Sequence, residues 1–424
     1  MRLILKGGDG QPGCGGTGRT LQFDMVCDKT TTAANAAPNG TMFIYDTPAR
    51  KVDPVPGCTY RVVWRTPAAC PVPTPPTPPT PPLSVPLPTA SQLQWQQYEI
   101  GVIIHYNMET GKGQGCGIGG AGSPPASSFE PAPTFDATEW METSSALGAK
   151  YAVYVAKHEC GFCTWKTEAQ LPDGRTYPYA VGGPNATTVD VVASFVKAAR
   201  AAGIVPGFYY SISENTYANG LHLTEEQSIA LTVAQLSELW DAGAHGDLAE
   251  VWFDGGWRGM KANISGLLAS AQPKTVAFNG CNPPDGCIGA PDGGNTRWIG
   301  TEAGVAPDPC WSTGEKSGAG DPNSTVWNPG EADTTLQNGD NWFWNPSVGL
   351  RTLAQLTDVY VSFRSRSSVL VEALPPASFH HTSDLDLMLE LPAALYRWRQ
   401  HELAPRYCTC PEWLHPSRRQ GQIR

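Results

Sequence analysis

A proline-rich stretch, Pro71–Ala90, divides this chain of 424 residues into two parts. Ten of its twenty residues are proline, which fixes φ and has no N–H to donate, so neither a helix nor a sheet can form there. Such a sequence adopts extended polyproline II, which at about 3.1 Å per residue spans on the order of 60 Å. We therefore expect an elongated linker over residues 71–90, with independently folded parts before and after it.

The composition argues against two classes of protein. Hydrophobic residues make up 41% of the chain, which is enough for a large core. The net charge is −10, and Lys and Arg cluster only in the tail Arg418–Arg424, so nucleic acid is not the expected partner. No run of about 18 apolar residues occurs, so we expect no membrane span.

Cysteines and glycosylation sequons indicate a secretory protein. Twelve cysteines suit an oxidising compartment, and acceptor sequons occur at Asn39, Asn185, Asn263 and Asn323. We expect a secreted protein, extracellular or in the cell wall, or one of the lysosome or vacuole, whose signal peptide precedes the given sequence. The alternative is a cytosolic protein with incidental cysteines.

The part before the linker is predicted to be a small disulfide-rich, all-β module. Three short runs alternate in period two and are rich in β-branched and aromatic residues, which predicts strands at Thr20–Val26, Thr41–Tyr45 and Tyr60–Trp64. Seventy residues bury little apolar surface, so disulfides are the expected reinforcement. Four cysteines allow three pairings, and spacing does not choose among them.

Two cysteine-centred motifs occur in residues 1–70: Cys14-x12-Cys27 enclosing Gly18-Arg19-Thr20, and Cys58-Thr59-Tyr60 ahead of Cys70. They resemble part of a mannose-6-phosphate-receptor homology domain. The resemblance implies the pairs Cys14–Cys58 and Cys27–Cys70, with Arg19 and Tyr60 facing a sugar. The family has a Glu before its third cysteine, whereas no Glu occurs from Met1 to Gln97. A lectin for phosphomannosyl glycans and a truncated module both stay open.

Beyond the linker, apolar strand patterns alternate with amphipathic helix patterns. Helical spacing is clear in Thr138–Leu147, Thr188–Ala202 and Thr224–Ala242. Alternation over most of residues 91–400 predicts an α/β fold, a (β/α)8-like TIM barrel. A Rossmann or flavodoxin sheet is the alternative, but the glycine-rich Gly117–Gly122 opens no helix pattern. The predicted strands are Ile100–Tyr106, Tyr151–Lys157, Val205–Ile212, Ala249–Phe253, Thr275–Asn279, Thr296–Gly300 and Val369–Leu374.

In such a barrel, chemistry is found where the strands end. Imidazole, carboxyl and phenol groups stand at several predicted strand ends, and tryptophans are frequent nearby. Aromatic faces pack on apolar sugar faces, while carboxylates and imidazoles hold hydroxyls, so we expect a carbohydrate pocket. Cys160-x2-Cys163 has no second ligand pair at matching spacing, so we expect neither a metal nor a cofactor. The strand-end candidates are His105, His158, Glu159, Tyr209, Tyr210, Asp254 and Glu302.

These residues belong to motifs that follow one another along the chain. The motifs are Trp95-Gln96-x2-Glu99 with His105-Tyr106, Gly148–Phe162, Pro206–Ser211, Glu250–Gly255, Arg297–Gly300 with Glu302, Trp327-x-Pro329-x-Glu331-x-Asp333 and Asn341–Trp344. Together, over residues 91–400, they resemble glycoside hydrolase family 29 α-L-fucosidases, in particular the plant-like 1,3/1,4-specific branch. The chain is thus divided into a β module (1–70), a linker (71–90), a barrel (91–400) and a tail (401–424).

The resemblance implies a retaining exo-α-L-fucosidase that removes terminal fucose from oligosaccharides and glycoproteins. Asp254 would attack the anomeric carbon, and Glu302, 48 residues later, would protonate the leaving oxygen and then deprotonate water. Glu331 is the rival acid/base; we prefer Glu302 because its motif ends a predicted strand, whereas Glu331 follows Pro329-Gly330 in a loop. The expected sugar-binding residues are His105, His158, Glu159, Tyr210, Trp252, Trp342 and Glu331.

Departures from the family pattern motivate an alternative. Where relatives have two adjacent histidines the chain has His158-Glu159, and a Glu-Trp pair expected after His105 is replaced by Gly115-Cys116. These groups would hold sugar hydroxyls, and losing a charge-assisted hydrogen bond costs about 1.5–3 kcal/mol. The alternative is a catalytically impaired, lectin-like glycan-binding protein. We also expect a bond between Cys281 and Cys287 to be possible, and a last barrel helix at Ser383–Gln400.

Overall fold

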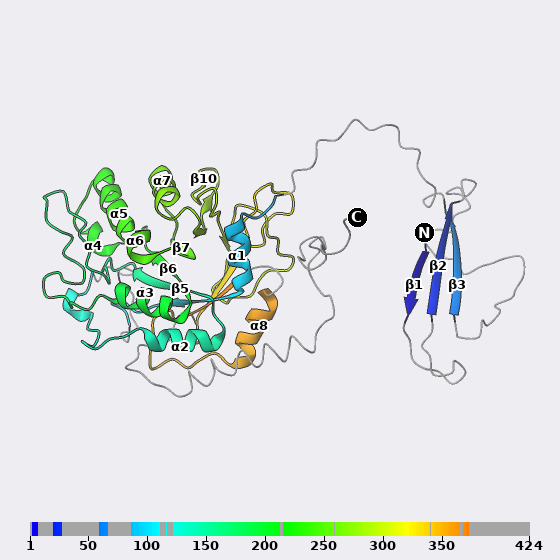
Figure 1. Cartoon of the computed structure of the whole chain (residues 1–424), viewed down its shortest axis with the longest axis horizontal. Coiled ribbons are helices and arrows are strands. Elements are labelled where there is room, and N and C mark those ends of the chain that lie inside the picture. Colours follow the sequence, from blue (N-terminus) through cyan, green and yellow to red (C-terminus); the bar gives the residue numbers. More distant parts are fainter. Residues whose placement is uncertain are drawn as a thin grey trace, which may run out of the picture. The chain divides into compact units, whose positions relative to one another are not determined.

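The computed structural model describes residues 2–6, 20–27, 59–66, 86–110, 116, 122–212, 215–257, 259–339, 341–363 and 368–372. The chain forms two compact units, Met1–Leu83 and Ser84–Arg424 (Figure 1). The predicted strand Thr41–Tyr45, the helix Ser383–Gln400, and Cys14, Cys58 and Cys70 lie outside the described residues.

The first unit contains a three-stranded sheet. Strand β2 (Thr20–Cys27) lies in the centre, antiparallel to β1 (Arg2–Lys6) and parallel to β3 (Thr59–Thr66). Strands β2 and β3 coincide with two of the predicted strands, whereas β1 was not predicted.

Eight parallel strands form the centre of the second unit. Their order is β11-β12-β13-β4-β5-β6-β7-β8, and a parallel bridge between Ala277 of β8 and Asn295, ahead of β11, closes the circle. This confirms the predicted (β/α)8-like barrel. The strands are β4 (Ile100–Ile104), β5 (Tyr151–Lys157), β6 (Val205–Tyr210), β7 (Glu250–Trp252), β8 (Val276–Phe278), β11 (Arg297–Trp298), β12 (Gly330–Thr334) and β13 (Ser368–Glu372).

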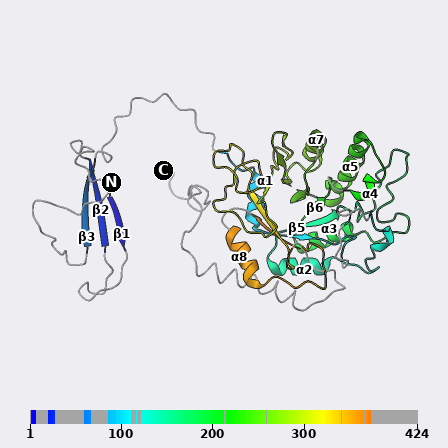
Figure 2. The ribbon, with the colours of Figure 1, turned by 180° about the vertical axis from the view of Figure 1, so that it is seen from behind.

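Most helices lie on the outside of the barrel strands, as Figures 1 and 2 show from opposite sides, whereas α1 packs against the inner core. Thr89, Asp190 and Thr224 each cap a helix by accepting a backbone N–H with the side-chain oxygen. The helices are α1 (Ala90–Tyr98), α2 (Thr138–Leu147), α3 (Val191–Ala202), α4 (Thr216–Asn219), α5 (Glu225–Leu239), α6 (Ala242–His245), α7 (Lys261–Ala271) and α8 (Leu353–Phe363), with a 3-10 turn at Ala126–Ser128.

Two barrel units lack a helix within the described residues. After β8 the chain forms the hairpin of β9 (Cys281–Asn282) and β10 (Gly286–Cys287), which the Cys281–Cys287 disulfide closes, as the sequence allowed. Between β11 and β12, residues 299–329 contain neither helix nor strand. These connections are therefore long loops, which run from the carboxyl end of one strand back to the amino end of the next.

Side chains of each strand alternate between two separate cores. On β5, Tyr151, Val153 and Val155 pack inside the barrel, while Ala152, Tyr154 and Ala156 pack against the helices. Trp95 of α1 joins the inner core, where its ring lies 6.4 Å from that of Tyr151. This alternation decides which strand residues face the inside of the barrel.

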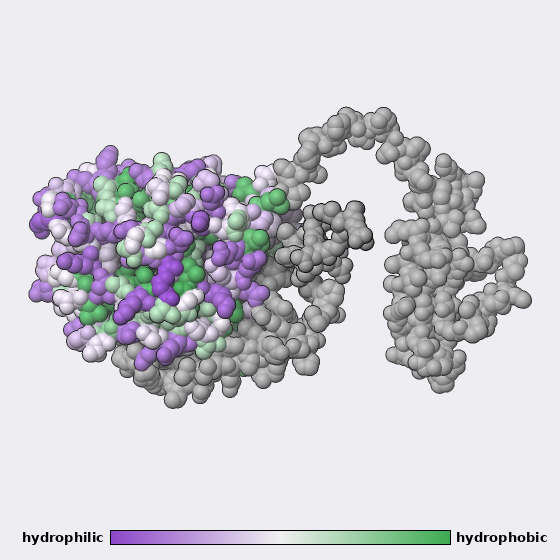
Figure 3. Space-filling view, in the orientation of Figure 1, coloured by the Kyte–Doolittle hydropathy of each residue, from purple (hydrophilic) through white to green (hydrophobic). Residues whose placement is uncertain are grey.

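The drawn face of the second unit is mainly hydrophilic, with small hydrophobic areas between polar residues (Figure 3). No helix in the described part of the chain is long and apolar enough to cross a membrane.

A substitution of Gly207 tests how closely the strands of the barrel pack against one another. A Cβ at this position on β6 would lie 2.6 Å from the backbone oxygen of Glu250 on β7 and 3.3 Å from Val153 Cγ2. Gly207→Ala is therefore expected to lower the free energy of unfolding by about 1–3 kcal/mol, because the strands must move apart. Urea unfolding of the variant measures this.

Gly266 on the exposed side of α7 is the matched control. A Cβ there meets no heavy atom within 4 Å, so Gly266→Ala is expected to be neutral or to stabilise by up to about 1 kcal/mol through helix propensity. Equal destabilisation by both variants would contradict the packing argument.

Candidate active site

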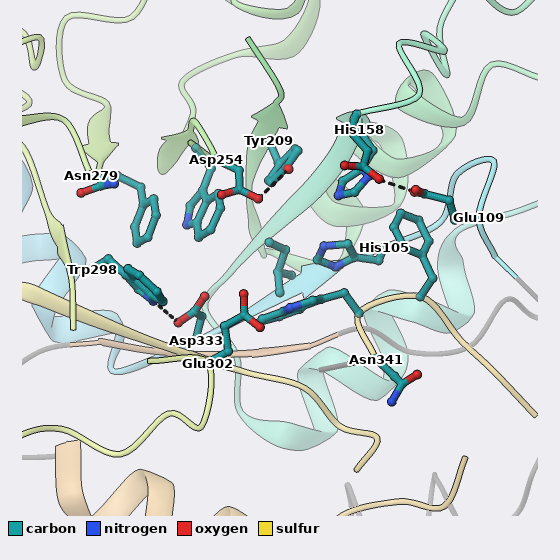
Figure 4. Close-up of a pocket in the computed structure, with 16 residues that line it drawn as sticks. His105, Glu109, His158, Tyr209, Asp254, Asn279, Trp298, Glu302, Asp333 and Asn341 are labelled. Carbon is teal, nitrogen blue, oxygen red and sulfur yellow. Dashed lines mark hydrogen bonds and ion pairs between the residues drawn. The ribbon is translucent and has the colours of Figure 1, made fainter. Parts of the chain in front are cut away.

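A cavity of about 360 Å³ opens at the carboxyl ends of the barrel strands (Figure 4). This is where ligands bind in barrels of this kind. Its lining combines aromatic rings with carboxyl, imidazole and amide groups. The lining residues are Ile103, His105, Glu109, His158, Glu159, Tyr209, Trp252, Asp254, Phe278, Asn279, Trp298, Glu302, Asp333, Asn341, Trp342 and Phe343.

The structure brings together most of the residues that the sequence singled out. Eight of them line the cavity: His105, His158, Glu159, Tyr209, Trp252, Asp254, Glu302 and Trp342. They come from segments after β4, β5, β7, β11 and β12 and from β6 and β7 themselves. Residues far apart in the sequence thus share one cavity, as expected for strand ends of a closed barrel.

Tyr210 and Glu331 are corrections, because neither lines the cavity. Strand alternation places Tyr209 inside the barrel and Tyr210 outside, where its hydroxyl donates to Gln235 Oε1 at 2.6 Å. Glu331 is not in a loop; it lies in strand β12, fully buried behind the cavity wall. Tyr209 and Asp333 take the corresponding cavity positions.

Asp254 follows β7 directly and points into the cavity across from Glu302, which follows β11 (Figure 4). The Tyr209 hydroxyl donates to Asp254 Oδ2 at 3.1 Å. Burial, then the charge of Asp254, raises the pKa of Tyr209, so the phenol stays protonated and continues to donate. Asp254 is thereby held as a hydrogen-bonded carboxylate at the cavity wall.

Two histidines lie at one side of the cavity with different protonation preferences. Burial, aided by the positive charge of His158, lowers the pKa of His105 well below its ordinary value. For His158 burial acts in the same direction, but the hydrogen bond and charge of Glu109, with the charges of Glu159 and Asp254, outweigh it and raise the pKa. His105 is thus a neutral group and His158 a better proton donor.

Glu109 is a cavity residue that the sequence analysis missed. It is buried, and its Oε2 lies 2.9 Å from His158 Nδ1. Ligand atoms of Glu109, His158 and Glu159 lie within 4.8 Å of one another, a spacing that a metal ion can use. The contact between His158 Nδ1 and Glu109 Oε2 already explains why these two side chains lie close together.

Below the cavity, two carboxyl groups meet inside the barrel. Glu331 accepts a hydrogen bond from the Trp252 indole N–H at 3.0 Å and is hydrogen-bonded to Glu250, the first residue of β7. Burial raises both pKa values, that of Glu250 to about 8. The charge and hydrogen bond of Glu250 raise the pKa of Glu331 further, whereas the hydrogen bond from Glu331 opposes the rise at Glu250. The pair therefore retains a proton and fixes Trp252 from behind.

Asp333 is a further carboxyl group at the cavity, two residues after Glu331 on the same face of β12. Its Oδ1 accepts the Trp298 indole N–H at 2.6 Å. Burial raises its pKa to about 7; the Trp298 hydrogen bond opposes this, and the charges of Glu302 and Asp254 add to it. Near neutral pH Asp333 is thus partly protonated, and it lies near the carboxyl groups of Asp254 and Glu302.

The raised pKa of Asp333 predicts how Asp333→Asn affects stability. Between pH 3.8, its ordinary pKa, and about 7, the unfolded chain has lost the proton that the fold keeps, so the wild-type protein loses stability as the pH rises. Asparagine has no such proton and still accepts from Trp298. We expect the stability of the variant relative to wild type to increase from pH 4.5 to pH 8.

Urea midpoints of both proteins at the two pH values measure this. A difference that does not depend on pH would contradict it.

Some lining residues were not named as site residues from the sequence. Asn279 ends a predicted strand, and Asn341 and Phe343 belong to the motif Asn341–Trp344, but all three stand in loops, where no periodicity marks a cavity residue. Glu109 follows Met108 at the start of a glycine-rich segment, where no strand or helix pattern marks it.

Comparison with known proteins agrees with this geometry. The family described as Alpha-L-fucosidase matches residues 123–371, more than half of the chain. Alpha-L-fucosidase 1 of Arabidopsis thaliana is 29% identical over 325 residues, which is 72% of this chain and 58% of that protein. Putative alpha-L-fucosidase 1 of Oryza sativa subsp. japonica is 31% identical over 349 residues, 77% of this chain and 60% of that protein. The chain thus spans about three fifths of the length of these two relatives.

A similar fold occurs in a solved structure. The crystal structure of a putative alpha-L-fucosidase from Bacteroides thetaiotaomicron superimposes with a TM-score of 0.62 and 26% identity, covering 73% of this chain and 69% of that one. Most of the barrel strands and of the cavity residues, including Asp254 and Glu302, lie within the part that the family matches. This chain therefore belongs to the alpha-L-fucosidase family.

Proposed function

We propose that this protein is a retaining exo-α-L-fucosidase that hydrolyses terminal α-L-fucose from glycans and glycoproteins. The observation that carries the proposal is the position of Asp254 and Glu302, which point into one cavity from different strand ends. Two carboxyl groups across a glycosidic bond are what a retaining hydrolase needs. That the sugar is α-L-fucose is inferred from the alpha-L-fucosidase family to which the chain belongs.

In the first step, Asp254 attacks the anomeric carbon while Glu302 protonates the departing oxygen. The Tyr209 hydroxyl, 3.1 Å from Asp254 Oδ2, orients the nucleophile so that an oxygen faces the sugar. A covalent fucosyl-Asp254 ester results. Glu302, now ionised, takes a proton from water, which attacks the anomeric carbon, breaks its bond to the Asp254 oxygen and releases fucose with its original configuration.

The rest of the lining suits a single deoxyhexose. The rings of Trp252, Trp298, Trp342 and Phe343 offer apolar surface to the sugar face and its methyl group. His105, His158 and Glu159 offer hydrogen bonds to hydroxyls on another side. A cavity of about 360 Å³ is at the small end of ligand sites, which favours one terminal sugar over an extended chain.

The glycan-binding alternative is less well supported. It rests on two departures from the family pattern: Glu159 stands where relatives have a second histidine, and the Glu-Trp pair after His105 is replaced. Glu109, a buried carboxylate paired with His158, supplies a polar group on that side of the cavity.

Two finer points belong to the same proposal. The 1,3/1,4-specific branch is favoured by the similarity to the two plant relatives. The secretory or lysosomal location and the mannose-6-phosphate-receptor-like module rest on the cysteines, sequons and motifs of the sequence.

Hydrolysis of 4-nitrophenyl α-L-fucoside, followed by proton NMR, tests the proposal. We expect α-L-fucose as the first product, before mutarotation; β-L-fucose first would exclude the retaining mechanism. Release of fucose from Lewis-type trisaccharides tests the branch. Binding of these sugars without any turnover would replace the proposal with the glycan-binding alternative.

A further inference from the structure

A disulfide joins Cys116 and Cys160, each of which is close to a residue that lines the cavity. It joins residues 44 positions apart, and the sequence analysis did not predict it. Cys160 lies two residues after His158, in the turn that follows β5. Both cysteines are buried, at 3% and 0% exposure, so the bond is enclosed by protein. It covalently attaches Cys116 to the segment that carries His158 and Glu159.

Cys116 also holds Glu109 through its backbone. The N–H of Cys116 donates to Glu109 Oε1 at 2.8 Å, and the other oxygen, Oε2, lies 2.9 Å from His158 Nδ1. The contacts form a closed ring: Glu109 to His158, along the chain to Cys160, across the disulfide to Cys116, and back to Glu109. Each oxygen of the buried carboxylate thus has a partner on one of the two cross-linked segments.

The ring has a direct effect on the cavity. Because His158 Nδ1 is taken by Glu109, the Nε2 atom is the one left for a ligand. Glu109 and His158 both line the cavity, and the ring of His158 stacks on Tyr209 at 5.5 Å, the residue that donates to Asp254. A shift of the Glu109–His158 pair would therefore change the groups around the bound sugar.

We propose that the Cys116–Cys160 disulfide is a positioning element of the active site, which fixes the Glu109–His158 pair so that it receives hydroxyl groups of the sugar. The inference rests on the proposed function for the identity of the ligand, but the ring of contacts is independent of it. Without the bond, the segments that carry Cys116 and His158 would no longer be covalently joined, so Glu109 could keep both of its contacts only if the two segments stayed in place. A buried carboxylate that loses a partner is strongly disfavoured.

Two variants and one control test this. Cys116→Ser/Cys160→Ser removes the bond, and Glu109→Gln keeps the bond but removes the charge beside His158. Cys281→Ser/Cys287→Ser removes the other described disulfide, which closes a hairpin and does not contact Glu109. Each protein is assayed for KM and kcat on 4-nitrophenyl α-L-fucoside, and the titration of His158 is followed by NMR.

For the first two variants we expect KM to rise about tenfold, with a smaller change in kcat, since a lost charge-assisted contact to a ligand has this size. The pKa of His158 should also fall, so that its NMR titration moves to lower pH. The groups that face His158 are Glu109, Glu159, Asp254, His105 and Tyr209, and of these the changes act on Glu109. The control should lose thermal stability but keep the wild-type KM and His158 titration.

The proposal is overturned if Cys116→Ser/Cys160→Ser melts earlier yet keeps the wild-type KM and His158 titration, since the bond would then serve the fold alone. It is also overturned if the control variant shifts both quantities equally, or if Glu109→Gln shifts neither. Should the serine pair fail to fold, Glu109→Gln still decides the role of the pair. If wild type turns over no fucoside, the proposed function fails, whereas the His158 titrations still test the ring.

Discussion

Asp254→Asn is expected to lower kcat on 4-nitrophenyl α-L-fucoside about ten-thousandfold or more, a loss of about 5 kcal/mol of transition-state stabilisation. An amide carries no negative charge and cannot form the ester that carries the sugar between the two steps. It still accepts the hydrogen bond from Tyr209, so the fold and the cavity are expected to remain. Initial rates of nitrophenol release measure the effect.

Asp247→Asn is the matched control. Asp247 is exposed and lies ahead of β7, at the end of the strand opposite to Asp254. We expect its activity to equal that of wild type. Retention of more than about a hundredth of the wild-type rate by Asp254→Asn would be too much for a lost nucleophile and would contradict the assignment.

Azide, added as an external nucleophile, shows which step of the reaction is lost when the Asp254 carboxylate is removed. Asp254→Gly leaves space beside the anomeric carbon, where azide can attack directly. The expected product is β-L-fucosyl azide, because a single displacement inverts the configuration. α-L-Fucosyl azide from this variant would assign Asp254 a different role.

Glu302→Ala is expected to lower kcat on 4-methylumbelliferyl α-L-fucoside about a hundred- to ten-thousandfold, the usual contribution of a general acid. The loss should be smaller with 2,4-dinitrophenyl fucoside, whose leaving group needs no proton. Azide should restore turnover, since it attacks the fucosyl-Asp254 ester without a general base, and here the product should be α-L-fucosyl azide. Glu142→Gln, on the exposed side of α2, is the control and should retain wild-type rates.

The same assays separate Glu302 from Glu331. Glu331 is buried against Glu250 and accepts the Trp252 N–H, so it has no direct path to a leaving group in the cavity. Azide should therefore restore nothing to Glu331→Gln. A variant of Glu331 that regained activity with azide, together with a Glu302 variant that did not, would reverse the two assignments.

The barrel was predictable where strands are apolar and long. Strand β5 and helix α2 have the predicted bounds, because β-branched and aromatic residues in β5 and the apolar stripe in α2 leave one interpretation of each. Strand β12 was missed because its residues, Gly330-Glu331-Ala332-Asp333-Thr334, include two acids and no large apolar side chain. Only the closed barrel around them makes burial of such a strand possible.

The sequence allowed us to predict which site residues lie at strand ends, but not which strand residues face the inside of the barrel. Asp254 and His105 could be located because they follow apolar strands. Tyr209 and Tyr210 are neighbours of the same type, and only the alternation of the folded strand decides which one enters the barrel. Glu109 becomes visible only through contacts with residues about 50 positions away, which no local pattern encodes.

The paired acids Glu250 and Glu331 have a consequence for the conditions under which the fold persists. Both keep a proton in the fold at pH values where the unfolded chain has released it, from the ordinary 4.5 up to about 8 for Glu250. Their contribution to stability is therefore largest in mild acid and is lost on going to alkaline solution. Buried carboxylates that form salt bridges weaken a fold on acidification, whereas this protonated pair favours the folded state in mild acid.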